Sequence, residues 1–208
     1  MTQNGIPRPA ETRQAAERLE YIDIAKGIGI FLVVLGHSID RDTFLSNWIN
    51  SFHMPLFFFL SGLCFNDAKY TEFMPFLKKR VSTLLLPLLY FCVILTVLSA
   101  LVHIDYYTVD NFLDGHFAGA MWFIYVLFVS ELFYWFINRV VRQKAVRVVV
   151  LFVCFAIGVA LDRFGISLPF NHCTVFVATF FYGVGHLCRG SVAARVREIP
   201  AIGGGGYC

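Results

Sequence analysis

Two residues near the start of the chain could do chemistry together, the lysine Lys26 and the histidine His37. They are eleven positions apart in an apolar run that contains several glycines. Each residue of an α-helix turns the chain by about 100°, so eleven steps return to within about 20° of the starting direction. Both side chains would then lie on one helix face, about 16 Å apart along the axis. A charge and a titratable base are costly in a membrane helix, which points to chemistry rather than packing.

The composition of the whole chain indicates an integral membrane protein. Of its 208 residues, 58% are hydrophobic and 15% are charged, whereas soluble domains are nearer half apolar and a quarter charged. The net charge of +3 is modest and the basic residues lie between apolar runs, so nucleic-acid binding is not supported. The six cysteines form no CxxC pair and lie mostly inside apolar runs. This favours reduced packing residues over a disulfide framework or a metal site.

The apolar runs predict an all-α fold, a polytopic bundle of about six transmembrane helices. The clearest span is Val81–Val102, whose 22 residues carry no charge and could cross about 30 Å of hydrocarbon. Pro87 is expected to kink this helix, which a helical bundle tolerates. The other five predicted spans are Ile22–Ile39, Trp48–Phe65, Phe117–Ile137, Val148–Leu161 and Leu168–Cys188.

The distribution of Lys and Arg predicts the side that each loop faces. With the N-terminus in the cytoplasm, fifteen of the seventeen Lys and Arg residues lie inside, and Arg41 and Arg163 lie outside. The loop 103–116 carries three aspartates and no Lys or Arg, as expected for an outer loop. The positive-inside rule therefore predicts that both termini are cytoplasmic. The predicted organisation is a polar cytoplasmic tail at 1–20, a membrane-embedded domain at 21–190 and a cytoplasmic tail at 191–208.

A second histidine, His53, is predicted to lie at a depth similar to that of His37. The first span runs outward and the second runs back, which brings the outer end of one beside the outer start of the other. Two imidazoles near one level can form a base with its partner, or a proton relay. The alternative for His37 is a hydrogen-bonded histidine at a helix end. The alternative for His53 is a structural role at the membrane interface.

Basic residues are predicted to gather at the cytoplasmic mouth of the bundle. Lys26, Lys79 and Arg80 would together suit the phosphates of an anionic substrate. In the alternative interpretation, Lys26 reaches the lipid headgroups and the cluster around Arg80 only enforces topology. Glu131 lies in the inner third of the fourth span, where an unpaired carboxylate is costly, and is expected to pair with Lys26 or Arg80.

Four ordered motifs in residues 18–130 resemble acyltransferase family 3 membrane proteins. The segment RLEYIDIAKGIGIFLVVLGH is similar to the family's opening pattern of Arg or Lys, ten residues and then His. SFHMPLFFFLSG resembles its second-span signature, FLKKRVSTLLLP its basic entry to the third span, and GAMWFIYVLF its Trp-containing span. These four segments are most similar to the fucose O-acetylase-like branch of bacterial carbohydrate acetyltransferases.

The resemblance implies an O-acetyltransferase-type enzyme of the cell inner membrane. An acyl group, commonly acetyl from acetyl-CoA, would pass to a hydroxyl of a carbohydrate or a lipid-linked glycan, and no bound cofactor or metal is expected. His37 matches the family's essential histidine and would act as general base, with Lys26 as its basic partner and His53 assisting. Acyl-CoA would approach the mouth formed by Lys26, Lys79 and Arg80.

This chain has fewer predicted spans than members of the family that it resembles. Family members usually have about ten spans, so a chain of about six is expected to be a short variant or a truncated frame. Polar residues without their partner helices would then favour poor stability, self-association and little acyl transfer. The rival interpretation is a non-enzymatic transporter or membrane subunit, in which Lys26, His37 and Glu131 line a proton or solute path.

Overall fold

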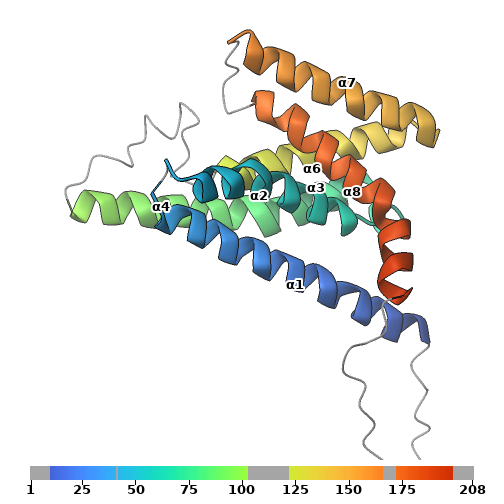
Figure 1. Cartoon of the computed structure of the whole chain (residues 1–208). Coiled ribbons are helices and arrows are strands. Elements are labelled where there is room, and N and C mark those ends of the chain that lie inside the picture. Colours follow the sequence, from blue (N-terminus) through green and yellow to red (C-terminus); the bar gives the residue numbers. More distant parts are fainter. Residues whose placement is uncertain (1–9, 41, 103–121, 166–171, 199–208) are drawn as a thin grey trace, which may run out of the picture.

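The computed structural model describes residues 10–40, 42–102, 122–165 and 172–198, and these are helices and the turns between them, without a strand (Figure 1). The all-α fold class is therefore confirmed. The helical segments follow the order of the predicted spans: α1 (Ala10–Ser38), α2 (Phe44–Leu63), α3 (Phe73–Arg80) continuing through η1 (Val81–Leu85) into α4 (Leu86–Leu101), α6 (Trp122–Val140), α7 (Lys144–Arg163) and α8 (His172–Glu198).

Five of these segments are long and apolar enough to cross a membrane, and α2 is the sixth long helix of the described part of the chain. The five candidate spans are Tyr21–Ser38, Phe73–Leu101, Trp122–Val140, Lys144–Arg163 and Cys173–Arg195. α2 contains several polar residues and packs between α1 and α8, where burial against other helices tolerates them.

The first and last helices reach into the predicted tails, because α1 begins at Ala10 and α8 ends at Glu198. They are therefore longer than the spans expected from the apolar runs alone. The predicted outer loop 103–116 and the ends of both predicted tails, residues 1–9 and 199–208, lie outside the described residues.

The third span is one continuous helical segment with a π-helical turn in its middle. Pro87 has no backbone N–H, and a proline ring clashes with the carbonyl four residues earlier, here that of Thr83. The turn before it, Val81–Leu85, widens so that the N–H of Leu86 donates to the carbonyl of Val81. A bond to the fifth preceding residue is the π-helical pattern. The structure thus places a widened turn directly before Pro87, and the expected kink stays a prediction.

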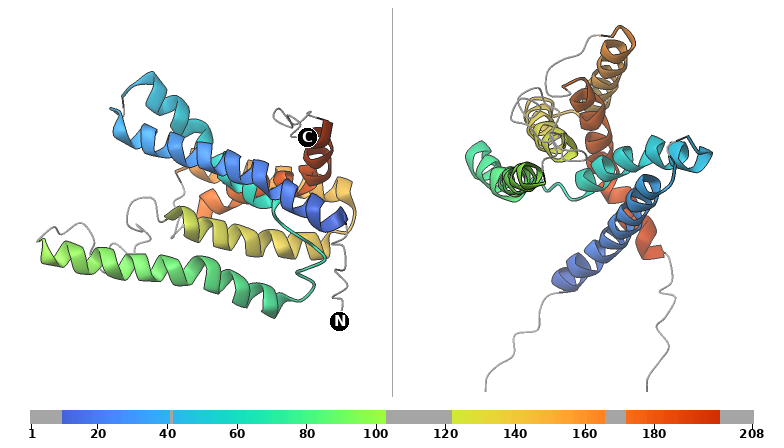
Figure 2. Two further views of the ribbon diagram at one scale, coloured as in Figure 1. Left: turned by 90° about the horizontal axis from the view of Figure 1, so that it is seen from below. Right: turned by 90° about the vertical axis from the view of Figure 1, so that its left-hand side faces the viewer.

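The bundle is organised around α8. This helix packs against α2, α6 and α7, while α1 packs on α2 and the α3–η1 segment packs on α6 (Figure 2). The main hydrophobic core lies where these helices meet. It includes Phe58 of α2, Tyr134 of α6, Leu151 of α7 and Tyr182 of α8, and both tyrosines have no exposed surface.

The backbones of α2 and α8 touch at two glycines. A Cβ atom on Gly62 would lie 1.9 Å from the carbonyl oxygen of Tyr182, and one on Gly185 would lie 2.1 Å from the carbonyl oxygen of Phe59. Real Cβ atoms essentially never approach another atom closer than 3.0 Å, so only glycine fits at either position. Lipid supplies no hydrophobic force between helices, so their association depends on this kind of close packing.

Two loops that the charge pattern places in the cytoplasm meet at one end of the bundle. Asp67, in the connection between α2 and α3, accepts a hydrogen bond from Asn138 near the end of α6 and lies 3.3 Å from His186 of α8. The middle of α1 reaches the same end, since Lys26 Nζ lies 3.8 Å from Cys64 Sγ. We call this the basic end. The arrangement agrees with the predicted alternation of the spans, and the side of the membrane that it faces stays a prediction.

Replacing either crossing glycine with alanine should push α2 and α8 apart. Gly62→Ala and Gly185→Ala are each expected to lower the free energy of unfolding by about 1–3 kcal/mol, the usual cost of overpacking. Thermal unfolding of the detergent-purified chain, followed by circular dichroism, measures the change. Gly27→Ala is the matched control, because it gains the same helix propensity and its Cβ would meet nothing within 4 Å. Unfolding of both crossing variants at the control's temperature would contradict this packing.

Candidate active site

The pair of residues predicted to do chemistry lies on one helix. Lys26 and His37 both belong to α1, which is uninterrupted between them, so they share a face as expected. Lys26 is half-buried against Cys64, whereas His37 lies in the last turn of α1 with its side chain exposed. The imidazole is thus accessible to a substrate, while the lysine lies at the basic end.

Contacts with α2 hold the end of α1 that carries His37. The hydroxyl of Ser46 donates to the backbone carbonyl of Gly36 over 3.3 Å. A Cβ atom on Gly36 would lie 3.1 Å from the side chain of Ile49, so the two helices are in close contact there. Ser46 and Ile49 have no exposed surface. His37 therefore directly follows a residue that is fixed against α2.

The other predicted catalytic histidine, His53, is buried in α2 with only 5% of its surface exposed. Its Nδ1 lies 2.8 Å from the backbone carbonyl oxygen of Ile49. A carbonyl oxygen can only accept a hydrogen bond, so Nδ1 carries the proton. In the neutral ring Nε2 is then the acceptor, and the bond at Nδ1 fixes the direction in which it points.

The register of α1 against α2 gives the relative depth of the two histidines. Gly29 of α1 faces Phe57 of α2, and further along Gly36 faces the first turns of α2. In this antiparallel register His53 lies opposite the helical turn before Gly36. The levels of His37 and His53 therefore differ by four to five residues of α1, or about 7 Å along the axis.

The predicted basic mouth is divided between two parts of the bundle. Lys26 lies on α1, which packs on α2, whereas Lys79 and Arg80 end α3 and lead into the η1 turn packed on α6. Lys79 is exposed. Arg80 is engaged within the protein, because its Nε lies 2.9 Å from Oε2 of Glu131 and its guanidinium lies 5.3 Å from the ring centre of Tyr70. The role of these three residues in binding acyl-CoA stays a prediction.

The pair between Arg80 and Glu131 is one of the two partners expected for this carboxylate. Only 3% of the Glu131 side chain is exposed, so its charge needs a cation within the protein. Tyr182 of α8 lies beside the same carboxylate. Glu131 therefore belongs to the contact between α3, α6 and α8, and it is not the partner of Lys26.

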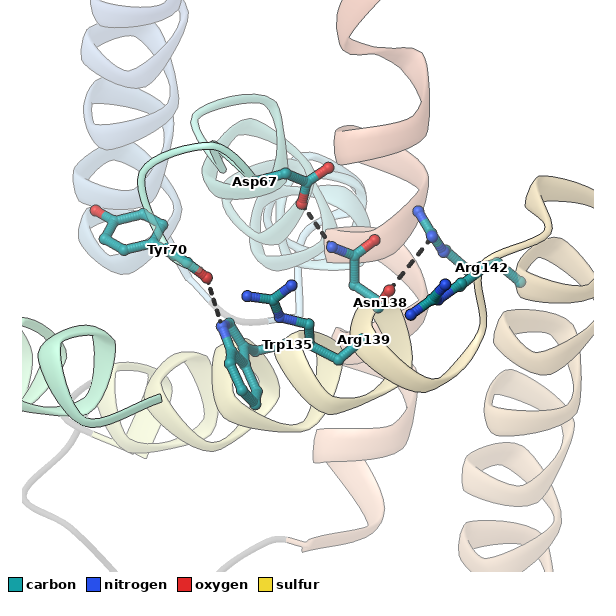
Figure 3. Close-up of a pocket in the computed structure, with 7 residues that line it drawn as sticks. Asp67, Tyr70, Trp135, Asn138, Arg139 and Arg142 are labelled. Atoms are coloured by element: carbon teal, nitrogen blue, oxygen red, sulfur yellow. Dashed lines mark hydrogen bonds between the residues drawn. The ribbon is translucent and has the colours of Figure 1, made fainter. Parts of the chain in front are cut away.

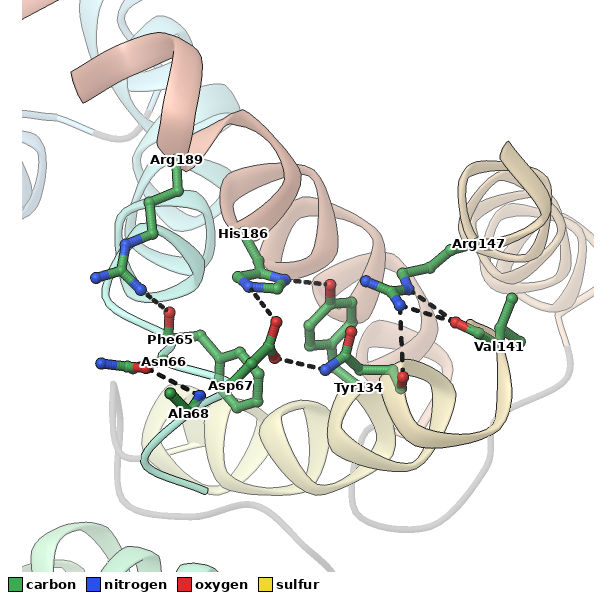
Figure 4. Close-up of polar contacts among 10 residues, drawn as sticks. Phe65, Asn66, Asp67, Ala68, Tyr134, Val141, Arg147, His186 and Arg189 are labelled. Atoms are coloured by element: carbon green, nitrogen blue, oxygen red, sulfur yellow. Dashed lines mark hydrogen bonds and ion pairs between the residues drawn. The ribbon is translucent and has the colours of Figure 1, made fainter. Parts of the chain in front are cut away.

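A second polar cluster joins α6, α8 and the connection between α2 and α3 (Figure 4). The hydroxyl of Tyr134 lies 2.7 Å from Nδ1 of His186, and Nε2 of His186 lies 3.3 Å from one oxygen of Asp67. Asn138 donates to the other oxygen of Asp67. With the neutral histidine ring, the hydroxyl donates to Nδ1 and Nε2–H donates to the carboxylate. Tyr134 and His186 are 52 positions apart, so no local spacing in the sequence indicates the cluster.

A pocket of about 400 Å³ opens beside this cluster (Figure 3). It lies between the α2–α3 connection and the end of α6, and Trp135 Nε1 donates to the backbone carbonyl of Tyr70 across its wall. The residues that line it are Asp67, Tyr70, Trp135, Asn138, Arg139, Arg142 and Arg147. The only sequence signal for this site is an aromatic helix that ends in closely spaced arginines.

The fold and these sites define a multi-pass helical membrane protein with polar residues held inside the bundle. A family model described as an acyltransferase domain matches residues 19–201, which is most of the chain. The chain belongs to this family, acyltransferase family 3, and the predicted membership is confirmed. No solved structure matches the chain at a significant level.

Two curated relatives match part of the chain. The nodulation protein NolL of Mesorhizobium japonicum is 36% identical over 122 residues, which are 52% of this chain and 33% of that protein. The nodulation protein NolL of Sinorhizobium fredii is 34% identical over 125 residues, which are 53% of this chain and 34% of that protein. The chain thus spans about a third of the length of the curated relatives it matches.

Breaking the buried ion pair should destabilise the bundle more than removing both of its members. Arg80→Met leaves Glu131 without its cation, and Glu131→Leu leaves Arg80 without its anion, each at a cost of about 3–5 kcal/mol. The double change Arg80→Met with Glu131→Leu is expected to recover much of the loss, because apolar side chains of similar size need no partner. Denaturant unfolding of the four proteins measures this coupling. Lys79→Met is the control at an exposed site. Additive losses in the double variant, or a control as unstable as Arg80→Met, would show that the pair is not coupled.

Proposed function

We propose that this protein transfers an acyl group, acetyl in the simplest case, from acyl-CoA to a hydroxyl of a carbohydrate or lipid-linked glycan. The cell inner membrane is the proposed location. The observation that carries the proposal is the geometry of α1. This helix lies within the part of the chain that matches the acyltransferase family, and it presents an accessible His37 at one end and Lys26 at the basic end.

The proposed reaction is direct attack of the acceptor hydroxyl on the thioester. His37 takes the hydroxyl proton as the oxygen bonds to the carbonyl carbon, and a tetrahedral intermediate forms. Its collapse breaks the C–S bond and releases CoA, whose sulfur takes the proton back from the imidazolium. A covalent acyl-enzyme is not needed. The nearest hydroxyl in the sequence, Ser38, donates to the carbonyl of Val34 over 2.7 Å and is held on its own helix.

Lys26 and His53 would support His37 from two directions. Lys26 lies about 16 Å along α1 from His37, which suits a substrate whose charged end and reactive thioester are joined by a long arm. His53 is buried about 7 Å along the axis from the level of His37, and its ring is oriented by its bond to Ile49. We assign His53 as a positioning residue for the base.

The rival function is transport of protons or solutes without acyl transfer. It requires Lys26, His37 and Glu131 to line one path. The buried pair of Glu131 with Arg80 belongs to the contact of α6 with the α3–η1 segment, whereas α1 packs on α2. This arrangement favours acyl transfer, and consumption of the thioester is the observation that separates the two functions.

Substitution of the proposed base should abolish transfer without loss of the protein. His37→Ala is expected to lower the rate by about 10²–10⁴-fold, the usual contribution of a general acid–base. The assay supplies acetyl-labelled CoA to membranes that contain the chain, and it counts label in the carbohydrate fraction and free CoA. Immunoblotting of the membranes reports abundance, and Ser38→Ala, one residue further on, is the matched control.

Two results of the same assay would contradict the proposal. Activity of His37→Ala within a few-fold of wild type would remove His37 from the reaction. Absence of label transfer by the unsubstituted chain would contradict acyl transfer itself. His53→Gln is expected to have a milder effect than His37→Ala, because a positioning residue does not take the proton.

A further inference from the structure

The pocket at the basic end carries an excess of positive charge, and we call it the arginine pocket. Of its lining residues, three are arginines and Asp67 is the one carboxylate. Both oxygens of Asp67 have partners, Asn138 on one side and His186 on the other (Figure 4). The carboxylate is therefore bound by Asn138 and His186 and forms no ion pair with a described arginine.

One of the three arginines, Arg147, belongs to the frame of the pocket. Its Nε and Nη2 donate to the carbonyl of Val141 over 3.2 and 2.8 Å, and Nη2 also donates to the carbonyl of Asn138 over 3.4 Å. Carbonyls at the end of a helix lack partners within the helix and carry its negative dipole end. Arg147, with 8% of its surface exposed, thus caps the end of α6 and fixes one wall of the pocket.

The other two arginines, Arg139 and Arg142, remain available to a ligand. Both are exposed, and no described carboxylate lies within ion-pair distance of either. Arg139 lies over the ring of Trp135, with 5.5 Å from its guanidinium carbon to the ring centre. Figure 3 shows its guanidinium between Trp135 and Asn138, on the pocket wall. Two guanidinium groups with five N–H donors each form a site for phosphate oxygens.

We infer that the arginine pocket binds the phosphate groups of the acyl-CoA substrate, with Arg139 and Arg142 as the residues that contact them. The inference rests on the proposed function, because that function supplies the ligand. The volume of the arginine pocket, about 400 Å³, lies in the range of small-molecule sites. The pocket also lies at the same end of the bundle as Lys26, whose partner Cys64 is close in sequence to Asp67. A substrate held here by its phosphates would extend along α1 toward His37.

Binding of unreacted CoA to the full chain tests this assignment. The purified protein is placed in phosphatidylcholine nanodiscs and titrated calorimetrically with CoA. Loss of one charge-assisted contact should weaken binding by about ten- to a hundredfold. Arg139→Gln and Arg142→Gln are therefore expected to show this loss, while Arg195→Gln, an exposed arginine near the end of α8, keeps wild-type affinity. Equal CoA affinity in all four proteins, or no binding by the unsubstituted chain, would overturn the assignment.

Two competitors identify the source of the phosphate. CoA is expected to displace inorganic phosphate, and it should also displace phosphatidylglycerol added to the nanodiscs. A pocket occupied by phosphatidylglycerol that CoA cannot displace would be a lipid site, and the inference would fail. Kinetics separate this failure from that of the proposed function. Acyl transfer with an unchanged KM for acetyl-CoA in both pocket variants would leave the function and refute the pocket. CoA binding that depends on the two arginines, without any acyl transfer, would support the pocket and refute the proposed function.

Discussion

The contact on which the rest of the structure depends is the crossing of α2 and α8 at Gly62 and Gly185. The two backbones touch there, and a Cβ atom on either residue would overlap a carbonyl oxygen of the partner helix. α1 is positioned by its packing on α2, so the location of His37 follows from this crossing. α8 continues from the crossing to His186, which holds the connection between α2 and α3 and with it one wall of the arginine pocket.

Two sets of charged residues in the described part of the bundle have different roles. Arg80, Glu131 and Arg147 are satisfied inside the protein, by each other or by backbone carbonyls at a helix end. Such groups are costly in hydrocarbon unless paired, and their partners fix how the helices meet. Arg139 and Arg142 face solvent beside a pocket and pair with no described carboxylate. The residues of this second set can therefore meet a charged substrate without the loss of a buried pair.

The sequence predicts the parts of this structure that depend on local order. The length of the apolar runs indicates the number and order of the helices, and the eleven-residue spacing places Lys26 and His37 on one face of α1. The cost of an unpaired carboxylate in a membrane reduces the partners of Glu131 to two, and Arg80 is the one observed. Pro87 likewise marks the irregular turn, although its π-helical form is visible only in the structure.

The remaining features depend on pairs that are far apart in the chain. Asp67 and Asn138 are 71 positions apart, and Tyr134 and His186 are 52 positions apart. No local sequence motif therefore predicts that these four residues form a cluster. The glycine contact of α2 and α8 is equally distant, and single glycines in apolar runs give no partner. The charge pattern does not distinguish Lys26 from Arg80, but Lys26 packs against Cys64 at the end of α2, and Arg80 is paired with Glu131 of α6. Long-range packing therefore decides that Arg80 is a structural residue, whereas Arg139 and Arg142 remain exposed.

The sidedness of acyl transfer is the most direct test of the proposal that the basic end takes acyl-CoA from the cytoplasm. Acetyl-CoA is highly charged and does not cross a bilayer, so sealed vesicles of opposite orientation present it to one face at a time. Labelled acetyl-CoA added outside inverted vesicles that contain the chain should label the carbohydrate fraction, and right-side-out vesicles should stay unlabelled. Label only in right-side-out vesicles would contradict the predicted orientation, and label in neither preparation would contradict the proposed function.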